Sequence, residues 1–254
     1  VDSMELRIDD LKKTYGSVKA LKGISYSFTP GVYGILGANG AGKSTMINLI
    51  TDNVSRDKDG GSITYCDGYN TCGNSQEYNC DDNEKTISGE PLDILKLGAK
   101  FRGIVGYMPQ QQNIYPELSL RRFLYFMASL KGLKKSEAGE DIDHYVRMVK
   151  LDDVLGKKLG AFSGGMKQRA LIAQALIGNP GILILDEPTA GLDPKERIRI
   201  RNLISEVAKD KIVIIATHVV TDVEFIAKEI VMLSNGKIIR SCLLYTSDAA
   251  DDKA

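Results

Sequence analysis

The segment that most constrains the fold is a glycine-rich loop at residues 37–44, which reads Gly-Ala-Asn-Gly-Ala-Gly-Lys-Ser. It follows an apolar run, Val32–Leu36, whose length suits a buried strand. From Ala41 to Ile50 the pattern becomes helical, with four apolar residues between positions 46 and 50 that can face a core. A strand, a glycine loop and a helix open an α/β unit. The sequence therefore predicts an α/β fold.

The spacing of this loop fits a phosphate-binding pattern, with four residues between its first glycine and the Gly-Lys-Ser triplet. Glycines let successive backbone N–H groups turn inward toward phosphate oxygens. Lys43 can reach the β- and γ-phosphates of a nucleotide, Ser44 can ligate Mg²⁺, and the following helix points its positive end at the anion. A plain glycine turn is the alternative, but the strand before the loop and the helix after it favour a phosphate site.

A second apolar run, Gly181–Leu185, ends in two adjacent carboxylates, Asp186 and Glu187. Such continuous apolar runs are expected of buried parallel strands, and residues 212–216 form another one. Asp186 can hold Mg²⁺ through its water shell, and Glu187 can polarise a water for attack on a γ-phosphate. An acidic pair at a strand end is commonplace by itself. Together with the phosphate loop it predicts a site for nucleotide hydrolysis.

The remaining patterns divide the chain into parts. Residues 6–8 and 24–28 alternate as strands do, so the N-terminal part is expected to be β structure. Between Ser119 and Val149 two helical stretches suggest a small helical subdomain, with Ser119 as an N-cap. A further helix is expected from Gly165 to Ile177, and Asn235-Gly236 indicates a hairpin.

Composition limits the classes of function. Lys plus Arg and Asp plus Glu each number 33, so the formal net charge is zero and no global charge favours nucleic acid. No apolar run approaches the roughly 20 residues of a membrane span, and no secretion signal is visible at the N-terminus. Three cysteines (Cys66, Cys72 and Cys80) lack the paired spacing of a zinc site, and both histidines lie far away in sequence. We therefore interpret the cysteines as incidental reduced thiols.

The stretch Phe162–Arg169, Phe-Ser-Gly-Gly-Met-Lys-Gln-Arg, places a second glycine-rich anion site at a predicted helix N-terminus. It resembles the signature stretch of ATP-binding-cassette (ABC) transporter ATP-binding subunits, and Ser163 lies 23 residues before Asp186 (186 − 163 = 23), where that family places it. The resemblance implies that Ser163, Gly164 and Gly165 serve the nucleotide held by a partner subunit, so that two subunits close head-to-tail over two ATP molecules. The alternative is an ordinary capped helix start.

Other landmarks of the family follow in order. Tyr15 resembles the aromatic residue that stacks on adenine, although core packing is an equal alternative for it alone. Gln110 resembles the glutamine that touches Mg²⁺ and the attacking water. Asp193, in the turn-like segment 190–194, resembles part of the loop that crosses the dimer interface. His218 resembles the γ-phosphate-sensing histidine.

The resemblance covers residues 4–240 and supplies the predicted site. The predicted catalytic residues are Lys43, Gln110, Glu187 and His218, and the predicted Mg²⁺ ligands are Ser44, Gln110 and Asp186. The predicted nucleotide-binding residues are Tyr15, Gly37, Ala38, Asn39, Gly40, Ala41, Gly42, Lys43, Ser44, Thr45, Ser163, Gly164, Gly165 and Asp193. The signature departs from the usual pattern at Phe162 and Met166, while its Ser-Gly-Gly centre is intact.

The implied fold is a phosphate-loop NTPase core with a parallel sheet, an N-terminal antiparallel β subdomain and an inserted α-helical subdomain. The core and β subdomain are expected at 1–109 and 163–240, and the helical subdomain at 110–162. Residues 69–92 are interpreted as a polar surface insertion. Residues 241–254 resemble translated sequencing-adapter read-through and are predicted to be a non-native tail.

The function implied by the resemblance is that of the ATP-hydrolysing motor subunit of a transporter, of export type by its signature. ATP and Mg²⁺ are its expected cofactors. Its expected partners are a second ATP-binding subunit, in a homodimer or heterodimer, and a separate permease that docks near Gln111–Phe126 at the cytoplasmic face of the membrane. A non-transport cassette ATPase acting on nucleic acid or ribosomes is the alternative, but no coiled coil and no second cassette occur, and direct nucleic-acid binding is not expected. A GTPase or small kinase is disfavoured because the dipeptide Asn-Lys never occurs.

Overall fold

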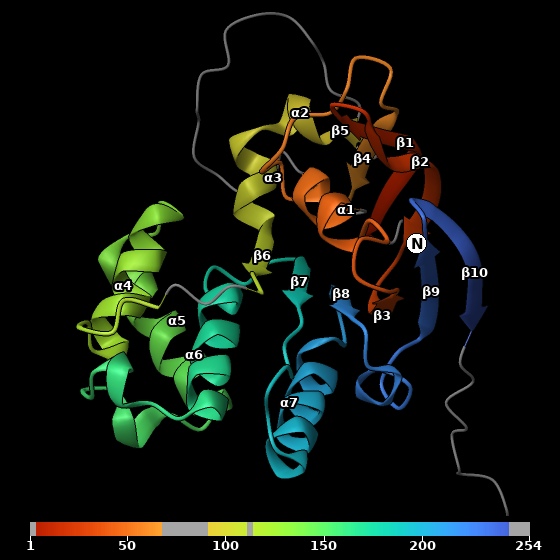
Figure 1. The fold of residues 1–254 in the computed structure, drawn as a ribbon. Coiled ribbons are helices and arrows are strands. Elements are labelled where there is room, and N and C mark those ends of the chain that lie inside the picture. Colours follow the sequence, from red (N-terminus) through yellow and green to blue (C-terminus); the bar gives the residue numbers. More distant parts are fainter. Residues whose placement is uncertain (1–3, 68–90, 111–113, 244–254) are drawn as a thin grey trace, which may run out of the picture.

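The computed structural model describes residues 4–67, 91–110 and 114–243. Its centre is a six-stranded sheet of order β10-β9-β3-β8-β7-β6 (Figure 1). All neighbouring strands in it run parallel except β9 and β10, which form the hairpin predicted at Asn235-Gly236. The strands are β3 (Gly31–Leu36), β6 (Val105–Met108), β7 (Ile182–Asp186), β8 (Ile212–Thr217), β9 (Glu229–Ser234) and β10 (Lys237–Leu243). The predicted parallel sheet is confirmed.

The second sheet has four antiparallel strands in the order β2-β1-β4-β5. Its strands are β1 (Glu5–Tyr15), β2 (Val18–Phe28), β4 (Ser62–Cys66) and β5 (Leu92–Asp93). The predicted N-terminal antiparallel subdomain is confirmed, but it also recruits β4 and β5, which the sequence patterns did not indicate. β2 begins at Val18, immediately after the Tyr15 turn, rather than near residue 24.

Helix α1 (Lys43–Ile50) lies between the two sheets (Figure 1). Met46, Ile47, Leu49 and Ile50 are all buried, as the helical pattern predicted. Together they join one core that also contains side chains from β1, β2 and β3. The helix begins at Lys43 and not at Ala41, because Gly42 has a positive φ of 111° and is its N-cap.

The other face of the central sheet is covered by helices. Along β7 and β8, alternate buried side chains enter the α1 core and a second core formed with these helices. This two-sided burial explains the unbroken apolar runs of both strands. The helices of this second layer are α4 (Leu120–Leu130), α5 (Lys135–Met148), α6 (Gly164–Leu176) and α7 (Pro194–Val207).

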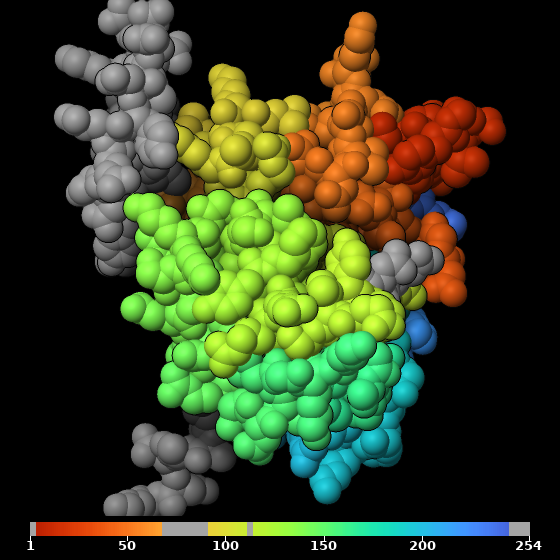
Figure 2. All heavy atoms as spheres, turned by 90° about the vertical axis from the view of Figure 1, so that its left-hand side faces the viewer, coloured from red at the N-terminus to blue at the C-terminus, as the bar shows by residue number. Residues whose placement is uncertain are grey.

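Helices α4 and α5 and the short turns η1 (Asp152–Val154) and η2 (Leu159–Ala161) occupy the segment predicted to be the helical subdomain. They pack on α6, and Ser119 caps α4 as predicted by accepting a hydrogen bond from the backbone N–H of Arg122. Figure 2 shows this subdomain (lime to green) spread across the middle of one face of the molecule. α2 (Ile94–Leu97) and α3 (Ala99–Ile104) lie above it in that view.

Parts of three expectations fall on residues that lie outside the described ones. Most of the predicted insertion 69–92, with Cys72 and Cys80, is outside them, as are Gln111 and the tail beyond residue 243. β10 pairs with β9 as far as Leu243, so residues 241–243 extend that strand. Whether the tail is native stays a prediction. No helix among the described residues is long and apolar enough to cross a membrane.

Candidate nucleotide site

The phosphate loop leaves the carboxyl end of β3 and returns into α1. Gly42 has a conformation that side chains rarely adopt, and a Cβ there would come within 2.8 Å of Leu21 Cδ2 and 3.0 Å of Ala20 O. Lys43 Nζ folds back over the loop and donates to the carbonyl oxygens of Gly37 at 2.5 Å and Ala38 at 3.3 Å. The loop therefore surrounds a nearly buried ammonium group with its carbonyl oxygens.

A cavity of about 590 Å³ opens over this loop. It is lined by most of the predicted phosphate-loop residues and by the carboxyl ends of β6 and β7. The predicted residues among its lining are Ala38, Asn39, Gly40, Gly42, Lys43, Ser44, Thr45, Gln110, Asp186 and Glu187. The other lining residues, which were not predicted from the sequence, are Val18, Lys19, Ala20, Lys22 and Asn235. Val18, Lys19, Ala20 and Lys22 follow Tyr15 within seven positions, so their proximity to the predicted base-stacking residue was the available signal.

Tyr15 lies at the end of β1, and its register partner on β2 is Val18, which lines the cavity. Its side chain is 45% exposed, so the core-packing alternative is not supported. The ammonium of Lys13 lies 5.4 Å from the ring centroid. The ring is thus an accessible aromatic surface beside the cavity, which suits stacking on a base.

Asp186 is nearly buried at the end of β7, and burial raises the pKa of its carboxyl to about 6. The neighbouring charge of Glu187 acts in the same direction as burial on this pKa, and Lys43 acts against them. Ser44, Gln110 and Asp186 all line the same cavity. Such a hydroxyl, amide and carboxylate set fits Mg²⁺, which prefers oxygen and shares its coordination with phosphates and water.

Within the described residues, no group of three or more His, Cys, Asp or Glu residues could hold a metal ion. Any divalent cation in the cavity would therefore need hydroxyl, amide or phosphate oxygens besides Asp186. Bound Mg²⁺ would supply positive charge that offsets the negative charge on the phosphates.

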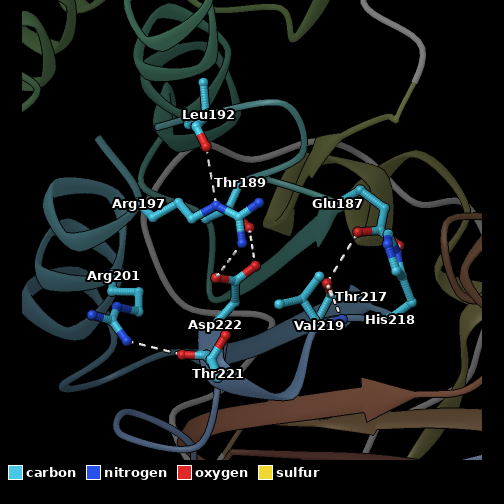
Figure 3. A network of polar contacts seen from close by, with 10 residues as sticks. All are labelled: Glu187, Thr189, Leu192, Arg197, Arg201, Thr217, His218, Val219, Thr221 and Asp222. Atoms are coloured by element: carbon cyan, nitrogen blue, oxygen red, sulfur yellow. Dashed lines mark hydrogen bonds and ion pairs between the residues drawn. The ribbon is translucent and has the colours of Figure 1, made fainter. Parts of the chain in front are cut away.

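Glu187 follows Asp186 in a strained conformation with a φ of 51°. Its backbone N–H donates to the carbonyl of Ala216 at 2.8 Å, which ties it to β8. Oε1 accepts from Nδ1 of His218 at 2.7 Å, and Oε2 accepts from the hydroxyl of Thr217 at 3.0 Å (Figure 3). An ionised carboxylate only accepts hydrogen bonds, so Nδ1 carries the ring proton in this contact. The structure thus brings the predicted pair Glu187 and His218 together.

Thr217 is a functional candidate that sequence analysis missed. It is fully buried at the end of β8, and its oxygen also accepts from the backbone N–H of Val219. Its position next to His218, at the end of a predicted strand, was the available signal. The carboxyl ends of neighbouring parallel strands lie at the same edge of a sheet, so Thr217 could be expected near Glu187.

The second glycine loop lies elsewhere. Ser163 is the N-cap of α6, and its hydroxyl accepts from the backbone N–H of Met166 at 3.3 Å. Among the described residues that line the cavity, none comes from 163–165 or from Asp193. Asp193 instead caps α7 by accepting from the backbone N–H of Glu196. The chain therefore separates its two predicted phosphate-binding loops.

A glycine loop between a buried strand and a helix, facing two carboxylates at the end of a neighbouring strand, defines a phosphate-loop nucleotide-binding protein. Residues 21–190 match a family model described as ABC transporter. The chain belongs to this family and has the fold of its ATP-binding cassettes.

Among relatives, the chain is 34% identical to the linearmycin resistance ATP-binding protein LnrL of Bacillus subtilis, over 92% of this chain and 68% of the relative. It is 31% identical to a Nod factor export ATP-binding protein I of Burkholderia thailandensis, over 90% of this chain and 67% of that protein. It is also 34% identical to ABC transporter A family member 8 of Dictyostelium discoideum, but over only 24% of that protein's length.

Solved structures agree. A dimeric bacterial ABC transporter cassette, MJ0796, is 25% identical and superposes with a TM-score of 0.73 over 94% of this chain and 98% of that one. A dimeric post-hydrolysis state of the same cassette bound to ADP and phosphate gives a TM-score of 0.72 at 25% identity, over 94% and 98% of the two chains. The cavity described above is the candidate nucleotide site of this cassette.

Proposed function

We propose that this chain is the ATP-hydrolysing subunit of a transporter of export type, and that two such subunits close head-to-tail over two ATP molecules to drive a separate permease. The observation that carries the proposal is the separation of the two glycine loops. The phosphate loop, Asp186 and Glu187 line the cavity, but the Ser163 loop does not. A loop built for an anion and placed away from the chain's own cavity suits a nucleotide on a second subunit.

The side chains in the cavity, and His218 beside it, have distinct roles in this mechanism. Lys43 and the loop N–H groups bind the β- and γ-phosphates, and Ser44, Gln110 and Asp186 would hold Mg²⁺. Glu187 accepts the proton of the attacking water. His218 orients Glu187 through the contact of its Nδ1 with Oε1. The partner's Ser163 loop adds donors where negative charge develops on the phosphate.

Export is favoured by the relatives, since the name of one refers to Nod factor export and the name of another to linearmycin resistance. The permease is proposed to dock on the helical subdomain near α4. There Tyr115 and Phe126 form an exposed edge-to-face pair with ring centroids 5.8 Å apart. Tyr and Phe are enriched in the cores of protein–protein interfaces, so this pair suits a protein partner.

The test uses Glu187→Gln, which keeps the size of the side chain but removes the proton acceptor. We expect this variant to bind ATP and to accumulate as an ATP-dependent dimer, measured by size-exclusion chromatography with light scattering. The control is the double variant Glu187→Gln with Lys43→Ala, which is expected to stay monomeric in the presence of ATP. A Glu187→Gln protein that hydrolyses ATP at the wild-type rate, or that stays monomeric with ATP bound, would overturn the proposal.

A further inference from the structure

Asp222 is a buried carboxylate that the proposed reaction does not use. It ends the short turn η3 (Val220–Asp222), four residues after His218, and its side chain is only 5% exposed. Removing an ionised carboxylate from water is costly unless the group is paired and hydrogen-bonded. The side chains that pair with Asp222 therefore indicate its structural role.

Both partners of Asp222 belong to the segment that follows Glu187. The hydroxyl of Thr189 donates to Oδ2 at 2.5 Å, and a guanidinium nitrogen of Arg197 lies 3.5 Å from Oδ1 (Figure 3). Arg197 also donates through Nε to the carbonyl of Leu192 at 3.1 Å. Asp222 thus holds the loop 189–193 at two points, directly at Thr189 and through Arg197 at Leu192.

Helix α7 is fixed to the same turn by a second arginine. Arg201 donates to the carbonyl of Thr221 at 2.9 Å, and its guanidinium lies 5.4 Å from the ring centroid of Phe225. The two arginines are four residues apart, so they project from one face of α7. Side-chain contacts of two arginines therefore join the turn containing Asp222 to α7.

Residues 217–222 end at Asp222 and begin beside the proposed catalytic base, Glu187. Thr217 and His218 contact the two carboxylate oxygens of Glu187. Residues 187–193 and 217–222 consequently lie alongside each other and are joined by side-chain contacts at both ends (Figure 3). One end carries Glu187, and the other carries the loop that leads to Asp193.

We propose that Asp222 is a positioning residue, which transmits the placement of the 189–193 loop to His218 and Glu187. This inference rests on the proposed function, in which that loop meets the partner subunit. Closing of the dimer would then set the geometry of the base through Thr189, Asp222 and Thr217, with no direct contact between Asp222 and the nucleotide.

The first test is independent of hydrolysis and observes His218 itself. The chain has two histidines, His144 and His218, so their ring resonances can be assigned by NMR with a His218→Gln variant. In the nucleotide-free protein, Thr189→Val and Asp222→Asn are expected to displace the His218 ring resonance and to leave that of His144 in place. Thr189→Ser keeps the hydroxyl and is expected to restore the wild-type position.

The second test separates catalysis from binding. Both variants are expected to lower kcat for ATP hydrolysis about tenfold, while KM for ATP stays within about twofold, since neither residue lines the ATP cavity. In the double variant the losses are expected to be smaller than additive, because the two substitutions break one shared contact. Thr51→Val is the matched control, since it removes another buried threonine hydroxyl bond, at the end of α1.

The outcomes distinguish this inference from the proposed function. The positioning role is overturned if the His218 resonance does not move in Thr189→Val and Asp222→Asn. It is also overturned if kcat is unchanged in these variants, or if kcat and KM change together as they do in Thr51→Val. If Asp222→Asn does not fold, Thr189→Val, which preserves volume, decides the result. If the wild-type protein does not hydrolyse ATP, the proposed function fails, and the His218 resonance alone decides whether Asp222 positions the histidine.

Discussion

The hydroxyl of Thr217 donates a hydrogen bond to Oε2 of Glu187 at 3.0 Å, and both side chains are buried. The register of the central sheet produces this contact. Asp186 of β7 pairs with Ala216 of β8, so the next residues in the chain, Glu187 and Thr217, come close together. The backbone of Glu187 is strained at φ 51°, and Thr217 and His218 hold its carboxylate in place.

Thr217→Val removes this hydroxyl without changing the side-chain volume. We expect kcat for ATP hydrolysis to fall about tenfold, because the carboxylate of Glu187 loses one of its two orienting contacts, and KM for ATP to stay unchanged. Steady-state kinetics check this expectation. Thr217→Ser is expected to keep most of the activity, and a Thr217→Val enzyme with wild-type kcat would contradict the positioning of Glu187.

Gly165 and Gly164 form a matched pair for testing the signature loop. A Cβ on Gly165 would lie 2.6 Å from Oε2 of Glu196, whereas a Cβ on Gly164 would meet only Leu192 at 3.7 Å. Gly165→Ala should therefore lower the free energy of unfolding by about 1–3 kcal/mol, because Glu196 is held by Arg169 and Arg199. Gly164→Ala should be nearly neutral.

Thermal or denaturant unfolding measures the difference between these two variants. Adding Glu196→Ala to Gly165→Ala removes the atoms that clash, so the double variant should lose less stability than the two single effects sum to. Equal stability of Gly164→Ala and Gly165→Ala would show that the close approach of Glu196 does not matter.

Lys131 joins the helical subdomain to the end of α6. Its Nζ donates to the carbonyl oxygens of Ala175 at 3.2 Å and Ile177 at 2.6 Å, and burial lowers the pKa of its ammonium to about 8, although Asp141 raises it. The unfolded chain holds this proton up to about pH 10.5. Between these pH values the unfolded state therefore binds more protons than the folded state, and stability contributed by Lys131 rises with pH.

Lys131→Met removes the titrating group and keeps an unbranched side chain. From about pH 7 to about pH 10, the wild-type protein is expected to gain about 2 kcal/mol in free energy of unfolding relative to this variant. Chemical denaturation at several pH values measures the difference, in which the other titrating groups cancel. A difference that is constant or falls with pH would contradict the burial of the charged amine.

The proposed permease surface contains Phe126, whose side chain is 41% exposed. Phe126→Ser is expected to leave ATP hydrolysis by the isolated chain unchanged and to abolish both capture of a co-expressed permease and stimulation by it. Leu130→Ser is the matched control, since Leu130 is an exposed apolar residue (66%) at the end of the same helix. Equal permease capture by both variants would place the docking surface elsewhere.

Local patterns predicted much of the site because its central parts are local. The strand, loop and helix around Lys43 occur in one short stretch, and ten of the predicted residues line a single cavity. The carboxylates were predictable because β7 is buried on both faces and ends abruptly in charge. Each of these features depends on residues close together in the sequence.

Other features depended on sheet register and helix placement. Asp222 and Thr189 are 33 residues apart, so no local sequence pattern predicts their contact. Helix α7 was missed although Asp193 and Pro194 are good start signals and its buried residues follow helical spacing at 200, 203, 204 and 207. Its arginines and acidic residues obscured that period, and Arg197 was missed with it.

The central claim is that each ATP site is shared between two subunits, with Lys43 on one and Ser163 on the other. It is tested most directly by mixing two variants, Lys43→Met and Ser163→Ala, each of which is expected to have little ATPase activity alone. A mixed dimer regains one intact site, so an equimolar mixture should recover about a quarter of the wild-type activity. A mixture no more active than the sum of its two components would contradict the claim.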